Sequence, residues 1–205
     1  ASFDPRCWQK KREVSPRVFR DLVSGVSQRR IARNCRLNRK TVVRKFLFLS
    51  KIANSLIKAQ LELRSEPVQS FQFDDLETFE HSKLKPLSVI MAVESKSRKI
   101  LGFRVARMPA KGHLVARAKK KYGFRKDERR KMRGELFTEI SPWIHPKAEI
   151  KSDESPHYPF DVKAYFPEAT HKTYKGRRGC VVGQGELKGG GFDPIFSLNH
   201  TYAML

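Results

Sequence analysis

The first third of the chain places apolar residues at helical spacing between signals that start and stop helices. Ser15-Pro16 and Gly25 predict the two ends of a first helix. Ser27 and Asn38 are placed as N-caps of a second and a third helix, and the third is expected to continue until the proline at position 67. The positions predicted to face inward are Phe19, Leu22, Val23, Ile31, Ala32, Cys35, Thr41, Val42 and Phe46.

A different pattern begins at Val68. Short runs of β-branched and aromatic residues predict strands, and three in succession predict an antiparallel meander. Later segments alternate between helical and strand character, so the expected fold class is α/β (α+β) with a mixed sheet. The predicted strands span 68–74, 86–93, 100–106, 148–153 and 169–174; the predicted helices span 126–140 and 158–166, with a last helix from about 194 and a glycine-rich loop over 183–191.

The offsets in the N-terminal part match a DNA-binding helix-turn-helix. A capped helix carries an Ile-Ala pair, a Leu stands in the turn, and a second cap precedes a Val, so a small residue lies where two helices cross. Arg36 departs from the pattern, because glycine is usual at that place in the turn. The alternative is a three-helix module that binds protein. The residues expected to contact DNA are Arg29, Arg30, Arg36, Arg39, Lys40, Thr41, Arg44 and Lys45.

The distribution of charge along the chain says more about function than its total of +22. Residues 1–66 carry 17 basic and 5 acidic side chains, and residues 111–134 carry 11 and 2. Clusters of this kind favour a polyanion such as double-stranded DNA, because neutralising phosphates releases counterions. We therefore expect Lys119, Lys120 and Lys121 to contact DNA, with Tyr122 and Phe124 available for packing or stacking. The alternative for the second cluster is a solvated helix face.

Several classes of function are disfavoured by what the sequence lacks. It has no apolar stretch of about 18 residues and no signal-peptide pattern, so we expect a soluble, cytoplasmic protein without a membrane partner. Its three cysteines form no CxxC pair, which argues against a zinc site or a disulfide framework. A nucleophile elbow and a phosphate-binding loop are also missing.

Acidic residues accompany two of the predicted strands. Asp74 ends the first predicted strand and Asp75 follows it, and Asp153 ends the fourth. Three antiparallel strands followed by strands alternating with helices is the order of the ribonuclease H-like fold, in which such acids converge. Carboxylate oxygens are the ligands that Mg²⁺ prefers, and a metal pair can activate a nucleophile for attack on a phosphodiester.

Four segments resemble the DDE class of bacterial insertion-sequence transposases: Phe-Gln-Phe-Asp74-Asp75-Leu-Glu-Thr-Phe, Ile-Lys-Ser-Asp153, the helix-turn-helix over 26–42, and the closing Ser-Leu-Asn199-His-Thr-Tyr-Ala-Met-Leu. The resemblance spans nearly the whole chain. It implies an enzyme that binds element ends and performs Mg²⁺-dependent strand cleavage and transfer. It also implies two Mg²⁺ (or Mn²⁺) ions, a homo-oligomer on DNA and a location at the bacterial nucleoid.

The same resemblance assigns the catalytic and metal-binding residues. Asp74 matches the first acid, with Asp75 as the alternative, and Asp153 matches the second. Relatives usually have Glu at the third position, where this chain has Asn199, as in the Asp-Asp-Asn variants of the class. The alternative for Asn199 is an ordinary residue of a helix's first turn. Glu154 and Glu186 are lesser candidates for the third ligand.

The expected organisation is a helix-turn-helix domain with a helical connector over 1–66 and a ribonuclease H-like catalytic domain over 67–205, with a basic insertion near 111–134. Because the chain stops inside a predicted helix, we expect it to be truncated at its C-terminus. The alternative functions are a non-catalytic DNA-binding protein, either domesticated or an inactive remnant, and a nuclease of the Holliday-junction type on the same fold.

Overall fold

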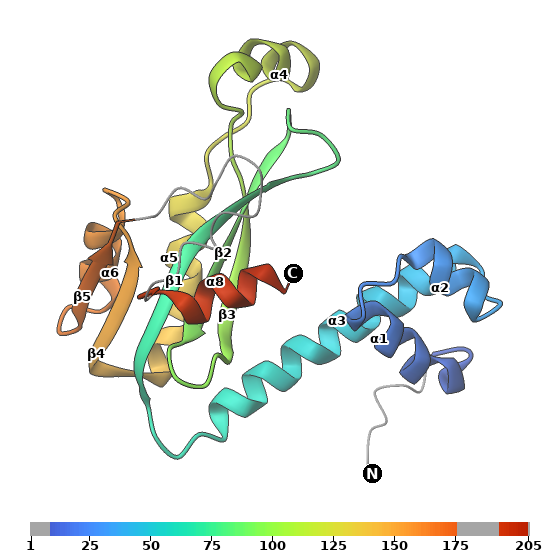
Figure 1. Ribbon diagram of the computed structural model, residues 1–205, viewed down its shortest axis with the longest axis horizontal. Coiled ribbons are helices and arrows are strands. Elements are labelled where there is room, and N and C mark those ends of the chain that lie inside the picture. The colour runs from blue at the N-terminus through green and yellow to red at the C-terminus, as the bar shows by residue number, and fades with distance from the viewer. Residues whose placement is uncertain (1–8, 176–192, 205) are drawn as a thin grey trace. The chain divides into compact units, whose positions relative to one another are not determined.

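The computed structural model describes residues 9–175 and 193–204 (Figure 1). The chain divides into two compact units, residues 1–60 and 61–205. The sequence analysis placed the boundary at residue 66, at the end of the connector helix.

The N-terminal unit consists of a short 3₁₀ turn η1 (Arg12–Val14) and three helices, α1 (Ser15–Val23), α2 (Gln28–Asn34) and α3 (Arg39–Glu62). Its core is formed by Val18, Ile31, Ala32 and Val42, and Leu22 and Cys35 pack against it. Of the three residues expected to face inward from α1, Leu22 packs against the core, but the prediction was wrong for Phe19 and Val23, which are 46% and 68% exposed. Phe46 of α3 is also exposed.

The caps between these helices follow the sequence prediction in two places. Ser27 Oγ accepts a hydrogen bond from the Arg30 amide at 3.4 Å, and Asn38 Oδ1 accepts one from the Lys40 amide at 2.9 Å. Arg36 has a φ of 50°, so the turn adopts the left-handed conformation without a glycine. Ser15 is the first residue of α1, with Val14 before it as the N-cap.

The second unit is built on a five-stranded mixed sheet with the order β3-β2-β1-β4-β5. The pairs β1–β2 and β2–β3 are antiparallel, which confirms the meander, and β1–β4 and β4–β5 are parallel. This arrangement is compatible with the expected ribonuclease H-like fold. The strands are β1 (Val68–Phe79), β2 (Pro86–Glu94), β3 (Ile100–Arg107), β4 (Ile144–Asp153) and β5 (Thr170–Tyr174).

Helices connect and cover these strands (Figure 1). Between β3 and β4 the chain forms η2 (Gly112–Leu114), α4 (Val115–Tyr122), α5 (Arg129–Ile140) and η3 (Ser141–Trp143). Helix α6 (Tyr158–Tyr165) connects β4 to β5, and α8 (Phe196–Ala203) ends the described chain. The predicted glycine-rich loop and Glu186 lie outside the described residues.

The two faces of the sheet are covered by different helices, and β1 shows which residue faces which. Phe73 packs against Phe137 of α5, with ring centroids 5.0 Å apart. Gln72, on the other face, accepts a hydrogen bond from the Leu198 amide of α8 at 3.0 Å. Because side chains alternate along a strand, Asp74 belongs to the α8 face and Asp75 to the α5 face.

Candidate active site

Asp74 and Asp153 come from neighbouring parallel strands. The paired part of β1 and β4 ends with Gln72 aligned with Lys151. Asp74 and Asp153 follow this pair by two residues on their respective strands, so both point to the α8 face. The charge of Asp153 acts on Asp74, so the two carboxylates lie near each other. Strand β1 is longer than predicted and continues to Phe79 because its pairing with β2 does, so Asp74 lies within the strand.

The electrostatics of Asp74 reflect this proximity. Burial, and after it the negative charge of Asp153, raise the pKa of Asp74. Two hydrogen bonds to Asp74 Oδ1 act in the opposite direction, from the Asp75 amide at 2.7 Å and from the Tyr158 hydroxyl at 3.0 Å. A cation between the two carboxylates would relieve their repulsion, which is the condition that a metal site fulfils.

Asp75 has a different environment on the α5 face. Its Oδ2 accepts a hydrogen bond from Arg133 Nη1 at 3.1 Å, and Arg133 Nε donates to Asp161 Oδ2 at 2.8 Å. Arg133 is 3% exposed, so the three side chains form a buried ionic cluster. Burial is the main reason that the pKa of Asp75 rises to about 6. The sequence left Asp74 and Asp75 open as first ligand, and this pairing favours Asp74.

Tyr158 connects the buried cluster to Asp74. Its ring lies 4.8 Å from that of Phe73 and 4.7 Å from the guanidinium carbon of Arg133, while its hydroxyl donates to Asp74. Burial and the neighbouring acids raise the pKa of Tyr158, so the hydroxyl remains a donor. Tyr158 was not among the residues predicted for the site, because a tyrosine at the start of a helix carries no motif.

The third expected ligand, Asn199, does not contact the two acids. Asn199 lies on α8, is exposed, and donates from its amide nitrogen to Asp193 Oδ2 at 2.9 Å. One turn later the Tyr202 hydroxyl donates to the carbonyl oxygen of Asp74 at 2.6 Å, which fixes α8 against the strand. Within residues 9–175 and 193–204, no hydrogen bond joins Asn199 to Asp74 or Asp153, so the structure does not bring the third candidate into contact with the two acids.

The carboxylate and amide oxygens of these residues are suitable ligands for a hard divalent cation. Only the two carboxylates lie near each other, however. Asp153 Oδ1 accepts a hydrogen bond from the Ser155 amide at 3.0 Å. The described part of the chain contains no cluster of three or more His, Cys, Asp or Glu side chains that could hold a metal ion. Two carboxylates are therefore in place, and a third ligand would have to be an amide oxygen or a group outside this set.

Most of the expected DNA contacts of the N-terminal unit are exposed, and one is not. Lys45 is 1% exposed and its Nζ donates to Ser15 Oγ at 2.8 Å and to the Lys10 carbonyl at 3.1 Å. Desolvation lowers the pKa of Lys45. The expectation for Lys45 was therefore wrong, because α3 turns this position inward. Thr41 is half-buried, and the exposed candidates are Arg29, Arg30, Arg36, Arg39, Lys40 and Arg44.

The basic residues expected in the second unit lie at the end of α4. Lys119, Lys120 and Lys121 are all exposed in the last turn of this helix. Phe124, directly after the helix, is 84% exposed. None of these cations forms an ion pair with an acidic side chain among the described residues.

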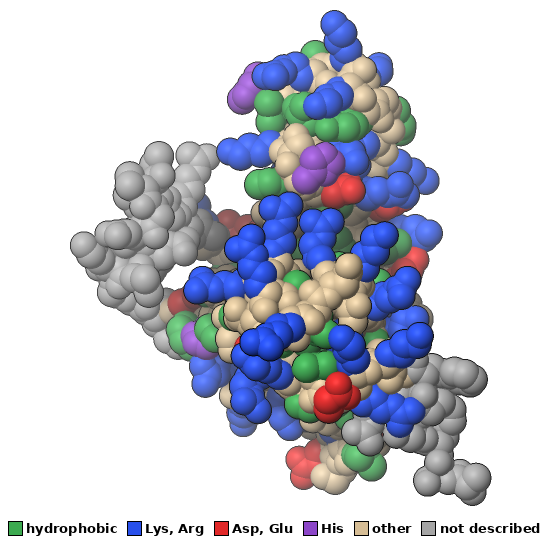
Figure 2. Space-filling model, turned by 90° about the vertical axis from the view of Figure 1, so that its right-hand side faces the viewer, with side chains coloured by type: hydrophobic (Ala, Val, Ile, Leu, Met, Phe, Trp, Pro, Cys, Tyr) green, Lys and Arg blue, Asp and Glu red, His purple; other side chains and the backbone are tan. Residues whose placement is uncertain are grey.

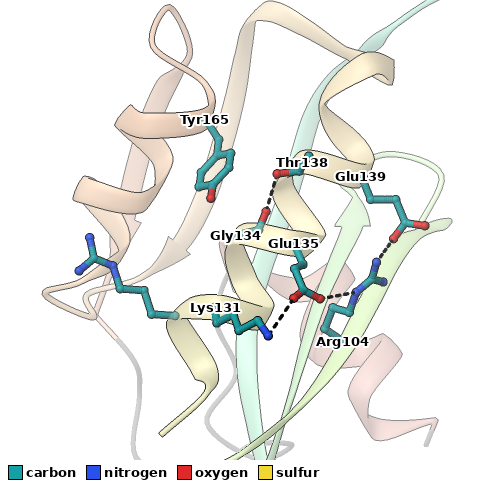
Figure 3. Close-up of a pocket in the computed structure, with 8 residues that line it drawn as sticks. Arg104, Lys131, Gly134, Glu135, Thr138, Glu139 and Tyr165 are labelled. Carbon is teal, nitrogen blue, oxygen red and sulfur yellow. Dashed lines mark hydrogen bonds and ion pairs between the residues drawn. The ribbon is translucent and has the colours of Figure 1, made fainter.

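A pocket of about 620 Å³ lies on the α5 face, between α5, β3 and α6 (Figure 3). Its charges are paired: Arg104 contacts Glu139 at 2.6 Å, and Lys131 contacts Glu135 at 3.7 Å. Because Asp74 and Asp153 belong to the other face of the sheet, this pocket is separate from the candidate site.

Comparison with known proteins identifies no relative, since no family model matches the chain and no curated protein matches it. None of the described helices is long and apolar enough to span a membrane.

Proposed function

We propose that the protein is a transposase of the DDE class, which binds the ends of an insertion sequence and cleaves and joins DNA strands at Asp74 and Asp153. The observation that supports the proposal is the parallel pairing of β1 with β4 just before the two acids, together with the effect of the Asp153 charge on Asp74. Tyr202 and Tyr158 hold the β1 acid in place from two different helices.

The remaining architecture supports the same function. The strand order β3-β2-β1-β4-β5, with a helix after the last strand on the face of the acids, is compatible with a ribonuclease H-like catalytic domain. In this proposal the N-terminal unit acts as a helix-turn-helix, with α3 as the recognition helix and Arg39, Lys40 and Arg44 as residues that reach the DNA. We propose that the protein acts as a homo-oligomer on the DNA.

Asp74, Asp153 and the amide oxygen of Asn199 would hold Mg²⁺ or Mn²⁺. When bound, such ions lower the pKa of a water or 3′-hydroxyl and stabilise the leaving oxygen of the phosphodiester. Tyr158 fixes the position of Asp74 Oδ1, and the Ser155 amide occupies one oxygen of Asp153, so the second oxygen of Asp153 is left for the ion. Arg133 keeps the neighbouring Asp75 on the opposite face.

The test uses the full chain, a labelled duplex carrying the inverted repeats that flank its gene, and a supercoiled target plasmid. With Mg²⁺, the wild type should nick the duplex and yield joined products. Asp74→Asn and Asp153→Asn should lower cleavage by at least about 100-fold, because each removes a charged ligand. Binding of the duplex should remain within twofold of the wild type.

Glu168→Gln is the matched control, since Glu168 is exposed and is not a candidate ligand. It should cleave like the wild type. Cleavage that survives in Asp153→Asn would contradict the assignment of the site, and cleavage without any joined product would indicate a nuclease.

A DNA-binding protein without catalysis is the second candidate. It is favoured by Asn199, which contributes no charge and whose amide is bonded to Asp193. This candidate predicts binding of the repeats that is independent of metal, and no cleavage with either Mg²⁺ or Mn²⁺.

A further inference from the structure

The β1–β2 hairpin and the segment that carries α4 project from the same end of the sheet (Figure 1). We call residues 80–85 the hairpin tip and residues 108–126 the arm. The base of the arm is fastened to the hairpin on both sides. Lys111 forms an ion pair with Glu77 of β1, and Arg125 Nη2 donates to the carbonyl of Pro86, the first residue of β2, at 3.2 Å. The two segments are therefore held together at their bases.

Tyr122, the last residue of α4, joins the outer parts of the two segments. Lys85 Nζ of the hairpin tip lies 4.9 Å from the centre of the Tyr122 ring, and Lys121 Nζ lies 5.3 Å from it. The His81 ring meets the Tyr122 ring edge to face at 6.4 Å. An aromatic face attracts cations, so Tyr122 offsets the repulsion that two basic segments would otherwise exert on each other.

The surface that results is strongly basic. The arm contains seven Lys and Arg and no Asp or Glu, and it is joined there by Lys83 and Lys85 of the hairpin tip. Glu80 lies in the hairpin tip itself and pairs with Lys85. Three more acids border the surface and also pair with cations: Glu77 with Lys111, Asp127 with Arg129, and Glu128 with Arg107. Figure 2 shows Lys and Arg side chains gathered over the upper end of the molecule, where α4 lies.

We propose that the hairpin tip and the arm form a single binding site for the sugar-phosphate backbone of duplex DNA, with Tyr122 as the joint between its halves. The identity of this ligand rests on the proposed function. The placement supports it, because β1 runs from Asp74 to Phe79 directly toward the hairpin tip, a distance of about 17 Å. A duplex held there lies beside the acids.

The form of α4 argues against a lipid surface as the ligand. Ala118, its buried apolar residue, faces inward, and among the larger apolar side chains of the helix only Val115 is markedly exposed. An interfacial helix needs a continuous apolar face, whereas backbone binding needs only a fixed array of exposed cations.

The experiment measures binding of a fluorescent 20-base-pair duplex of arbitrary sequence by anisotropy, in EDTA and at several salt concentrations. The full chain carries Arg39→Gln, Lys40→Gln and Arg44→Gln, which removes the contribution of the N-terminal unit. In this background, Lys83→Gln and Lys120→Gln should each weaken binding and reduce the salt slope by about 1.

Tyr122→Ala should weaken binding several-fold although the net charge is unchanged, and Tyr122→Phe, which keeps the ring, should bind like the background. Circular dichroism and thermal melting show whether each variant is folded. If Tyr122→Ala unfolds, Lys83→Gln still tests the proposal, because its unchanged melting temperature would show that it is folded.

The proposal is overturned if Lys83→Gln binds unchanged while Lys120→Gln does not, since the hairpin tip would then take no part. It is also overturned if Tyr122→Ala is folded and binds unchanged, or if vesicles with 30% phosphatidylserine compete with the duplex. Because the assay needs neither metal nor cleavage, a protein that binds here but never cuts DNA contradicts only the proposed function.

Discussion

At the scale of single residues, two adjacent acids have different partners and different roles. Asp74 and Asp75 follow one another on β1, yet one lies beside Asp153 and the other pairs with Arg133. Arg133 is shared between Asp75 and Asp161, so one buried cation serves two carboxylates. The Oδ1 atom of Asp75 is buried without a hydrogen-bond partner among the described residues. Such a cluster is sensitive to protonation.

This environment predicts a pH dependence of stability. The folded-state pKa of Asp75, about 6, lies above the unfolded value of 3.8, so the folded protein binds the proton more tightly. The contribution of Asp75 is therefore fully present below pH 3.8 and is lost as the pH rises through 6. We expect the free energy of unfolding to fall by about 1 kcal/mol between pH 5 and pH 7 from this group.

Urea denaturation at pH 5, 6 and 7 measures this effect. Asp75→Asn should show a flatter dependence over the interval, and Glu154→Gln, an exposed control, should keep the wild-type slope. If Asp75→Asn and the wild type lose stability in parallel, the raised pKa of Asp75 is refuted.

At the scale of elements, α3 carries two adjacent basic residues with opposite roles. Lys45 lies inside the N-terminal unit and fastens α3 to the start of α1 through Ser15. Arg44, one residue earlier, is exposed on the face proposed to meet DNA. A rotation of 100° per residue separates the two side chains, so the helix can use one for stability and the other for binding.

Alanine substitutions at these two positions test the distinction. Lys45→Ala should lower the free energy of unfolding by about 1–3 kcal/mol, because it removes two hydrogen bonds and buried packing. Arg44→Ala should change stability by less than about 0.5 kcal/mol and weaken binding to the inverted repeats several-fold. Urea denaturation and fluorescence anisotropy give the two quantities. The opposite pattern would mean that α3 presents the other face.

At the scale of the whole molecule, the charge of +22 resolves into two proposed DNA contacts and a nearly neutral sheet domain. Replacing Arg39, Lys40 and Arg44 together by Gln should reduce the preference for the inverted repeats over unrelated sequence. Replacing Lys119, Lys120 and Lys121 should weaken binding to both sequences about equally and reduce the salt slope. Competition assays with specific and unrelated duplexes measure the ratio. Equal losses of preference in the two variants would contradict this division.

Several features of the fold were predictable because they depend on local pattern. Side-chain periodicity predicts the five strands and helix α5. The caps at Ser27 and Asn38 follow from side chains that satisfy free backbone groups. Arg36, the departure from the helix-turn-helix pattern, adopts the left-handed conformation that glycine usually provides at that place.

Other features were decided only by the tertiary structure. Periodicity indicates that Asp74 and Asp75 face opposite sides of a strand, but which side faces the second acid depends on the register with β4, 70 residues or more away. Long-range packing also decided three other features. It buries Lys45, it places Val18 and not Phe19 in the core, and it brings Lys85 to the Tyr122 ring. The sequence by itself determined the elements and the acids they carry. Their partners were decided by long-range packing, because a side chain's environment is created by segments that the local pattern does not contain.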